Sequence, residues 1–153
     1  LSLNSSIQDN IAIAGMDRYA LAGFIICNSR ERAYADRLIE ELSVKCFDGS
    51  QRVSQLSGGN KQKVVFGKWI GRGSDVLILD CPTRGVDIGV KHAMYRLIEK
   101  LKKDGKSIIM ISEELPELIG MSDRILIMKD GRIQKEYTRS PDLSEADLIQ
   151  SMI

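Results

Sequence analysis

The chain has 153 residues, 43% of them hydrophobic, which is enough for one domain with its own core. Its 22 Lys and Arg residues nearly balance 21 Asp and Glu, so bulk charge gives no argument for binding nucleic acid or an anionic membrane. Three cysteines without a CxxC pair, Cys27, Cys46 and Cys81, argue against a disulfide scaffold or a zinc site and fit a reducing cytosol. No apolar run approaches the roughly 20 residues that span a bilayer.

The first fifty residues are predicted to be mainly helical. The chain opens with Leu1 rather than Met, and we expect it to be cut from something longer. Ser29 is the predicted cap of a helix whose apolar positions recur at helical spacing. These positions are Ala33, Ala35, Leu38, Ile39 and Leu42. We expect residues 1–50 to form a helical subdomain and residues 51–153 to form most of an α/β layer.

The middle of the chain reads as helix, strand, helix and strand. A helix follows Ser57 and ends near Gly71 or Gly73, and the apolar run Val76 to Asp80 comes next. An amphipathic helix then leads to a second apolar run, Ser107 to Ser112. Its apolar positions are Ala93, Met94, Leu97, Ile98 and Leu101. Continuous apolar strands around a helix are typical of a parallel sheet buried on both faces, so the predicted fold class is α/β.

The last third predicts a small antiparallel edge. Two strand-like segments, residues 124–128 and 133–137, flank a turn that contains Asp130-Gly131. Asp-Gly is a strong signal for a two-residue hairpin turn. Ser144 then has the position of a cap for a final helix through Leu148 and Met152.

The segment LSGGNKQK, residues 56–63, is the most informative part of the chain. Gly58 and Gly59 at a helix start let a phosphate approach the backbone, and free amides with the positive end of the helix dipole favour an anion. Ser57 adds a hydroxyl donor. The alternative is an ordinary Ser-capped helix after a loop, which Ser-Gly-Gly alone would favour.

A second segment, VLILDCPTRGVD, occupies residues 76–87. A carboxylate at the carboxyl end of a buried parallel strand lies where open α/β sheets bind ligands, and Asp80 could hold Mg²⁺ through water. The alternative for Asp80 is a side chain that only caps the turn after the strand.

In this order and spacing, the two segments resemble the signature, the Walker B strand and the D-loop of ABC ATPases. ISEELPELIGMSDR and ILIMKDGRI similarly resemble that family's switch region and the hairpin after it. LSGGNKQK and PTRGVDIGVK look more narrowly like the second nucleotide-binding domain of duplicated subunits that power ribose- and galactose-type sugar importers. The resemblance implies a partial P-loop NTPase fold. No GxxxxGK[ST] loop is present, and we expect it before Leu1.

The resemblance also implies roles for individual residues. Ser57, Gly58, Gly59 and Asn60 would contact ATP held by a companion nucleotide-binding domain. The D-loop at that interface would comprise Gly85, Val86 and Asp87. Asp80 would serve Mg²⁺ only when a P-loop is present. Further implied partners are membrane permease subunits beside the helical subdomain and, indirectly, a sugar-binding protein, with no nucleic acid, at the cytoplasmic face of the membrane. An incomplete sheet favours self-association.

Two departures from the family pattern fall at the chemistry. Cys81 stands where active members carry the Glu that polarises water, and a thiol cannot replace that carboxylate. Glu113 stands at the switch histidine position, and a carboxylate there would face like-charge repulsion from the triphosphate. The single histidine, His92, is predicted to be an exposed residue on a surface helix. We therefore expect the chain alone to be inactive and its own Walker B site to be degenerate.

Two rival functions remain open. One is an ABC-type ATPase without a transporter, used in DNA repair or translation, or a regulatory domain. Such proteins would be expected to carry insertions or basic arms, and the near-neutral charge weighs against them. The other is a catalytically dead nucleotide-binding fold that only stabilises a dimer.

Overall fold

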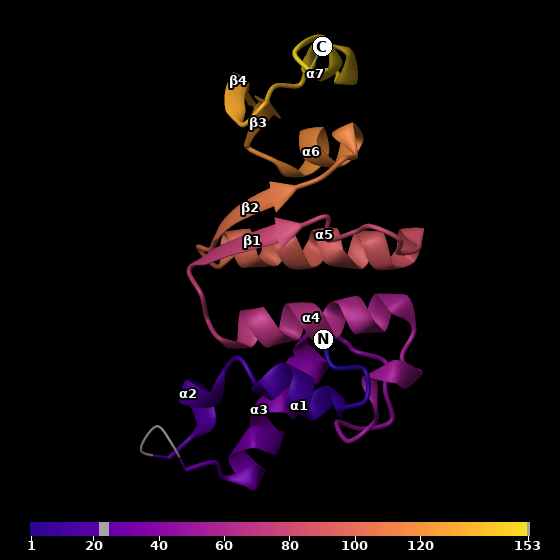
Figure 1. Ribbon diagram of the computed structural model, residues 1–153, viewed down its shortest axis with the longest axis vertical. Coiled ribbons are helices and arrows are strands. Elements are labelled where there is room, and N and C mark those ends of the chain that lie inside the picture. The colour runs from indigo at the N-terminus through magenta and orange to yellow at the C-terminus, as the bar shows by residue number, and fades with distance from the viewer. Residues whose placement is uncertain (22–24, 153) are drawn as a thin grey trace. The chain divides into compact units, whose positions relative to one another are not determined.

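The computed structural model describes residues 1–21 and 25–152, and Figure 1 shows its helices and strands. Residues 22–24 of the expected helical subdomain and residue 153 lie outside this range. The chain divides into two compact units, the first made of Leu1–Leu77 and Thr83–Ser107 and the second of Ile78–Pro82 and Ile108–Ile153. In the part of the chain that the structure describes, no helix is long and apolar enough to cross a membrane.

Helices dominate the first unit. They are α1 (Ile7–Ala12), α2 (Met16–Tyr19), α3 (Asn28–Glu41), the 3₁₀ helix η1 (Val53–Gln55), α4 (Gly58–Gly71) and α5 (Ile88–Lys103). Helix α1 contacts both α3 and α4, and the three lie side by side in Figure 1. Side chains of these three helices and of η1 form a buried core whose members include Ile7, Ile11, Leu38, Val53 and Val64. Through this core, α4 packs against α1 and α3.

The ends of the helices in this unit test the predicted caps. The prediction that Ser29 caps a helix is wrong, because α3 begins at Asn28 with Cys27 at the N-cap. The Ser29 hydroxyl instead lies 3.2 Å from the Cys27 sulfur. The helix predicted after Ser57 is confirmed as α4, and Gly73, with a φ of 76°, follows its end.

Strands β1 (Val76–Asp80) and β2 (Ser107–Ile111) form a two-stranded sheet. The Ser107 amide donates to the Asp75 carbonyl at one end and the Cys81 amide to the Ile111 carbonyl at the other. The strands therefore run in the same direction, as predicted. The prediction that both faces are buried is wrong, since alternate side chains in both strands are 52–67% exposed. These side chains are Val76, Ile78, Ile109 and Ile111.

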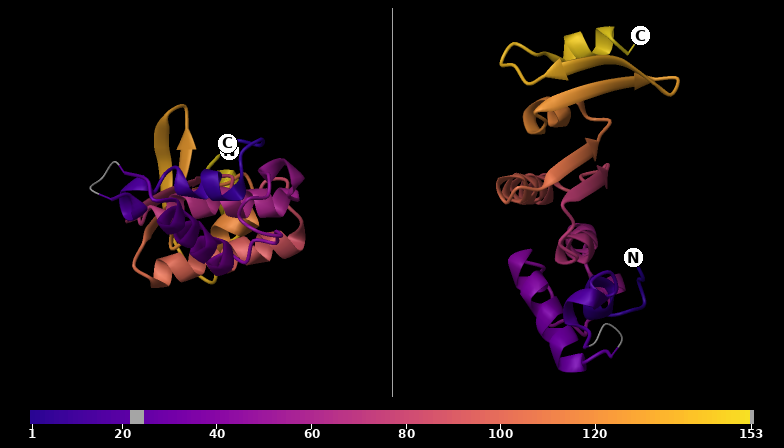
Figure 2. Two further views of the ribbon diagram at one scale, coloured as in Figure 1. Left: turned by 90° about the horizontal axis from the view of Figure 1, so that it is seen from below. Right: turned by 90° about the vertical axis from the view of Figure 1, so that its left-hand side faces the viewer.

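The second unit is completed by α6 (Leu115–Met121), β3 (Arg124–Lys129), β4 (Arg132–Thr138) and α7 (Glu145–Gln150). Strands β3 and β4 pair antiparallel, and Asp130 and Gly131 both have positive φ, at 51° and 73°, as the predicted two-residue turn requires. Ser144 caps α7 in a capping box with Asp147, which confirms its predicted role. The Tyr137 hydroxyl donates to the Asp147 carbonyl at 2.7 Å and ties α7 to the hairpin, whose neighbourhood Figure 2 shows.

Candidate functional site

The start of α4 is not an ordinary serine cap. Ser57 occupies the N-cap position with extended backbone angles, φ −63° and ψ 159°, but its side chain accepts no bond from the first helical turn. Ser6, Asp87 and Ser144, at the starts of α1, α5 and α7, all accept such a bond. Among the residues that the structure describes, the Ser57 side chain thus leaves the amides of the first turn of α4 uncapped, and they can serve an anion.

The Ser57 hydroxyl instead accepts a hydrogen bond from Asn60. The Asn60 side-chain N–H donates to Ser57 Oγ at 3.0 Å, and its carbonyl oxygen accepts from the Lys45 amide at 2.9 Å. Because Ser57 Oγ accepts a bond from within the protein, its own proton is left for an outside acceptor. The family resemblance implied only that Asn60 contacts nucleotide. The structure adds a hydrogen bond by which Asn60 orients the Ser57 hydroxyl.

Positive charge lies close to this segment. Burial, reinforced by repulsion from Lys45 and Arg96, lowers the pKa of Lys63. The Lys63 ammonium donates to the Ser43 carbonyl at 2.8 Å, just after the end of α3. An anion near the start of α4 would relieve the repulsion among these three cations.

The D-loop segment precedes α5 within the same unit. Gly85 has a φ of 70°, which favours glycine, and Asp87 lies at the N-cap of α5. The Asp87 side chain accepts a hydrogen bond from the Val90 amide at 3.0 Å. Asp87 is exposed, so one of its oxygens holds the helix start while the side chain stays open to solvent.

Asp80 and Cys81 lie at the carboxyl end of β1 in the second unit. Among residues 1–21 and 25–152, the exposed Asp80 carboxylate makes no hydrogen bond or ion pair, so it does not cap the turn. Cys81 has a φ of 44°, in the left-handed region, and its amide pairs with the last residue of β2. Because the two strands are parallel, the turn after β2 starts at the same sheet edge as Asp80.

That turn holds Glu113, which is exposed and which the family resemblance assigns to the switch position. Beside it, Ser112 donates a hydrogen bond to Glu117, whose side chain is buried at 4% exposure. The Glu114 amide donates in turn to the Ser112 hydroxyl at 3.1 Å. Sequence reasoning missed this tie. A usable signal was Pro116 near a helix start followed by an acidic residue in the first turn.

Magnesium was expected at Asp80 only together with a P-loop. No three His, Cys, Asp or Glu side chains gather closely enough to hold a metal ion anywhere in the described ranges. Asp80 is a single exposed carboxylate, so the donor set of this chain does not by itself fit a bound Mg²⁺ ion.

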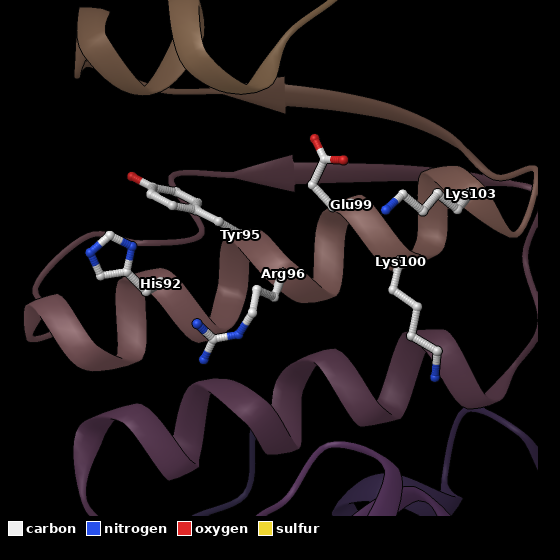
Figure 3. Close-up of a pocket in the computed structure, with 6 residues that line it drawn as sticks. All are labelled: His92, Tyr95, Arg96, Glu99, Lys100 and Lys103. Atoms are coloured by element: carbon white, nitrogen blue, oxygen red, sulfur yellow. The ribbon is translucent and has the colours of Figure 1, made fainter.

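A separate hollow runs along α5 (Figure 3). Its lining comes from that helix alone and consists of His92, Tyr95, Arg96, Glu99, Lys100 and Lys103. His92 is exposed, as predicted, and its ring lies edge-on to Tyr95 with centroids 6.2 Å apart. Lys100 is held by Glu41 at 2.8 Å. A hollow on one face of one helix lacks the enclosure of a ligand pocket, and no signature or Walker B residue lines it.

Curated relatives match most of the chain, although no family model does. It is 48% identical over 136 residues, 89% of its length, to the ribose import ATP-binding protein of Bacillus subtilis. It is also 48% identical over 128 residues, 84% of its length, to the galactose/methyl galactoside import ATP-binding protein of Clostridium tetani. The chain spans only 27% and 25% of these two relatives. They favour the sugar-import hypothesis over the DNA-repair or translation class.

Solved structures confirm the fold class. An ATP-binding cassette, MJ0796, in a dimeric post-hydrolysis state with ADP and Pi, matches with a TM-score of 0.77 at 18% identity, over 92% of this chain and 59% of its own. A second cassette, MJ1267, matches with a TM-score of 0.76 at 20% identity, over 97% of this chain and 63% of its own. The fold is that of part of an ABC-type P-loop NTPase.

Proposed function

We propose that this chain, which is similar to sugar-import ATP-binding proteins of the ABC ATPase family, completes an ATP site whose phosphate-binding loop lies on a companion domain. The observation that carries this proposal is the start of α4. Ser57 accepts a bond from Asn60 and leaves its proton and the first-turn amides available for an outside anion. The γ-phosphate of ATP held by another domain has the matching charge and acceptors.

The Walker B end of this chain would contribute less. Asp80 is free to act on a magnesium ion only with groups supplied from elsewhere, and Cys81 offers no carboxylate next to it. Glu113 adds negative charge at the switch position rather than an imidazole. The resulting ATPase is asymmetric: one composite site turns over, and the site built on Asp80 does not hydrolyse ATP rapidly.

The names of the relatives support a transport role for the complete subunit. In the complete subunit, the proposed site would couple ATP hydrolysis to sugar import through membrane permease subunits at the cytoplasmic face of the membrane. The helical subdomain of residues 1–50 is the proposed permease face, and a sugar-binding protein would take part indirectly.

The test is ATP-dependent association with a companion domain. A companion nucleotide-binding domain that carries a phosphate-binding loop, with its catalytic Glu replaced by Gln to hold ATP, is mixed with this chain and analysed by sedimentation. We expect a 1:1 complex with Mg-ATP and none with ADP. Ser57→Ala should weaken the complex. Equal association with ATP, ADP and no nucleotide would refute the proposed role.

A further inference from the structure

The two signature glycines differ in their surroundings. A Cβ added at Gly58 would meet no atom within 4 Å, and Gly58 is exposed. A Cβ added at Gly59 would overlap the Val90 side chain, at 2.9 Å from Cγ1, 3.1 Å from Cβ and closer still to Cγ2. Gly59 is buried. Neighbouring positions of one motif therefore need glycine for different reasons.

Val90 cannot easily move aside. Its branched side chain has few rotamers in a helix, and its own Cβ, fixed by the backbone of α5, is among the atoms in the way. The same residue is held at the backbone, since its amide donates to Asp87 Oδ1 at 3.0 Å. A continuous chain of contacts thus runs from the D-loop residue Asp87, through Val90, to Gly59.

We infer that Gly59 and Val90 form a steric lock that sets the start of α4 against the start of α5. The glycine at position 59 serves this packing, and Val90 is a positioning residue that makes the signature and the D-loop one rigid surface. Gly58 is then the glycine that leaves room for a phosphate. The assignment of Gly58 rests on the proposed function, whereas the lock itself does not.

The lock is tested by thermal unfolding of the chain and four variants. Gly59→Ala should lower Tm by roughly 3–10 °C, because overpacking at a closely packed contact destabilises a chain of this length. Gly58→Ala should leave Tm unchanged or slightly raised. The double variant Gly59→Ala/Val90→Ala should recover most of the Tm of Val90→Ala, because only the 3.1 Å approach of the two Cβ atoms then remains. Equal Tm values for the two glycine variants, or no recovery in the double variant, would overturn the lock.

ATP-dependent association with the companion domain separates packing from phosphate contact. We expect Gly58→Ala to weaken association at least tenfold, which equals about 1.4 kcal/mol, without lowering Tm. The double variant should associate within about threefold of Val90→Ala. A double variant that is folded but no longer associates would show that Gly59 itself contacts nucleotide, against the inference. If the unmodified chain fails to associate, the proposed function fails, and the Tm comparison still decides the lock.

Discussion

Asn60 holds the hydroxyl of Ser57 at 3.0 Å while its own carbonyl oxygen accepts from the amide of Lys45. The orientation of the signature hydroxyl therefore depends on a loop that lies 15 residues before Asn60 in the sequence. Ser57 makes no capping bond to α4, which leaves the first-turn amides for a ligand.

Replacing Asn60 with Ala should weaken ATP-dependent association about tenfold, because one lost hydrogen bond of roughly 1–1.5 kcal/mol corresponds to that factor. The measurement is sedimentation with the ATP-loaded companion domain, supported by Tm to confirm folding. Gln134→Ala, which removes an exposed amide from β4, is the matched control and should associate normally. Unchanged affinity for Asn60→Ala would show that Ser57 needs no orienting partner.

Tyr34 is a buried core residue that the sequence analysis did not predict. It packs against Tyr19, and its hydroxyl is buried without a hydrogen-bond partner among the described residues. Burial raises its pKa. Backbone approaches closely at Gly15 and Gly71, where an added Cβ would overlap the phenol ring. The packing explains why both positions are glycine.

Tyr34→Phe should therefore keep or raise stability, by up to about 1 kcal/mol or roughly 2–4 °C in Tm, because it removes an unsatisfied buried hydroxyl. Thermal unfolding of this variant is compared with Tyr34→Ala, which leaves a cavity and should lose roughly 3–5 kcal/mol. A clear loss of stability in Tyr34→Phe would show that the hydroxyl has a partner after all.

Local signals in the sequence predicted most helices, strands and turns, but they did not predict the long-range contacts. Asp130-Gly131 and Ser144 act through neighbours in the chain, so turn and cap chemistry were enough to predict them. The Asn60 bond to Lys45 and the contact between Gly59 and Val90 depend on how α3, α4 and α5 pack. No period or motif encodes such packing, so these features of the site were not predicted.

The apolar side chains of β1 and β2 are more exposed than the sequence pattern predicted. Continuous apolar strands predicted burial on both faces, but Ile78 and Ile109 are 67% and 54% exposed. The apolar pattern of a strand shows which side chains it can bury, but burial also requires another element that covers them. The described residues supply no such element for the exposed face of β1 and β2.

Stability at low pH should report the α7 cap. Hydrogen bonds from the Ser144 hydroxyl, at 2.6 Å, and amide, at 2.9 Å, hold the pKa of Asp147 below its usual range. A depressed pKa contributes stability that is present above the unfolded value, about 3.9, and is lost as pH falls through the folded value.

Asp147→Asn should therefore lower Tm at neutral pH, and the difference from the unmodified chain should shrink as pH falls below about 3.9. Thermal unfolding across this range makes the comparison. Asp142→Asn, in the exposed loop before α7, is the control and should show a smaller difference at neutral pH. A difference for Asp147→Asn that stays constant with pH would contradict the assigned cap.

The proposed degeneracy of the Walker B site can be tested by placing a carboxylate at position 81. In a chimera where this chain replaces its matching segment of the Bacillus subtilis relative, Cys81→Glu should raise ATP hydrolysis less than about twofold, because Glu113 still occupies the switch position. Cys81→Glu/Glu113→His should raise it further. Cys81→Gln, which has similar size and no charge, is the control. A large rise from Cys81→Glu alone would show that Glu113 is no second lesion.

Calorimetric titration of Mg-ATP into the isolated chain tests most directly whether the chain completes an ATP site without a phosphate cradle of its own. We predict no binding heat up to about 1 mM ATP, a limit that corresponds to roughly 4 kcal/mol of affinity. Saturable binding with a micromolar Kd would contradict the account, because it would require a cradle within these 153 residues.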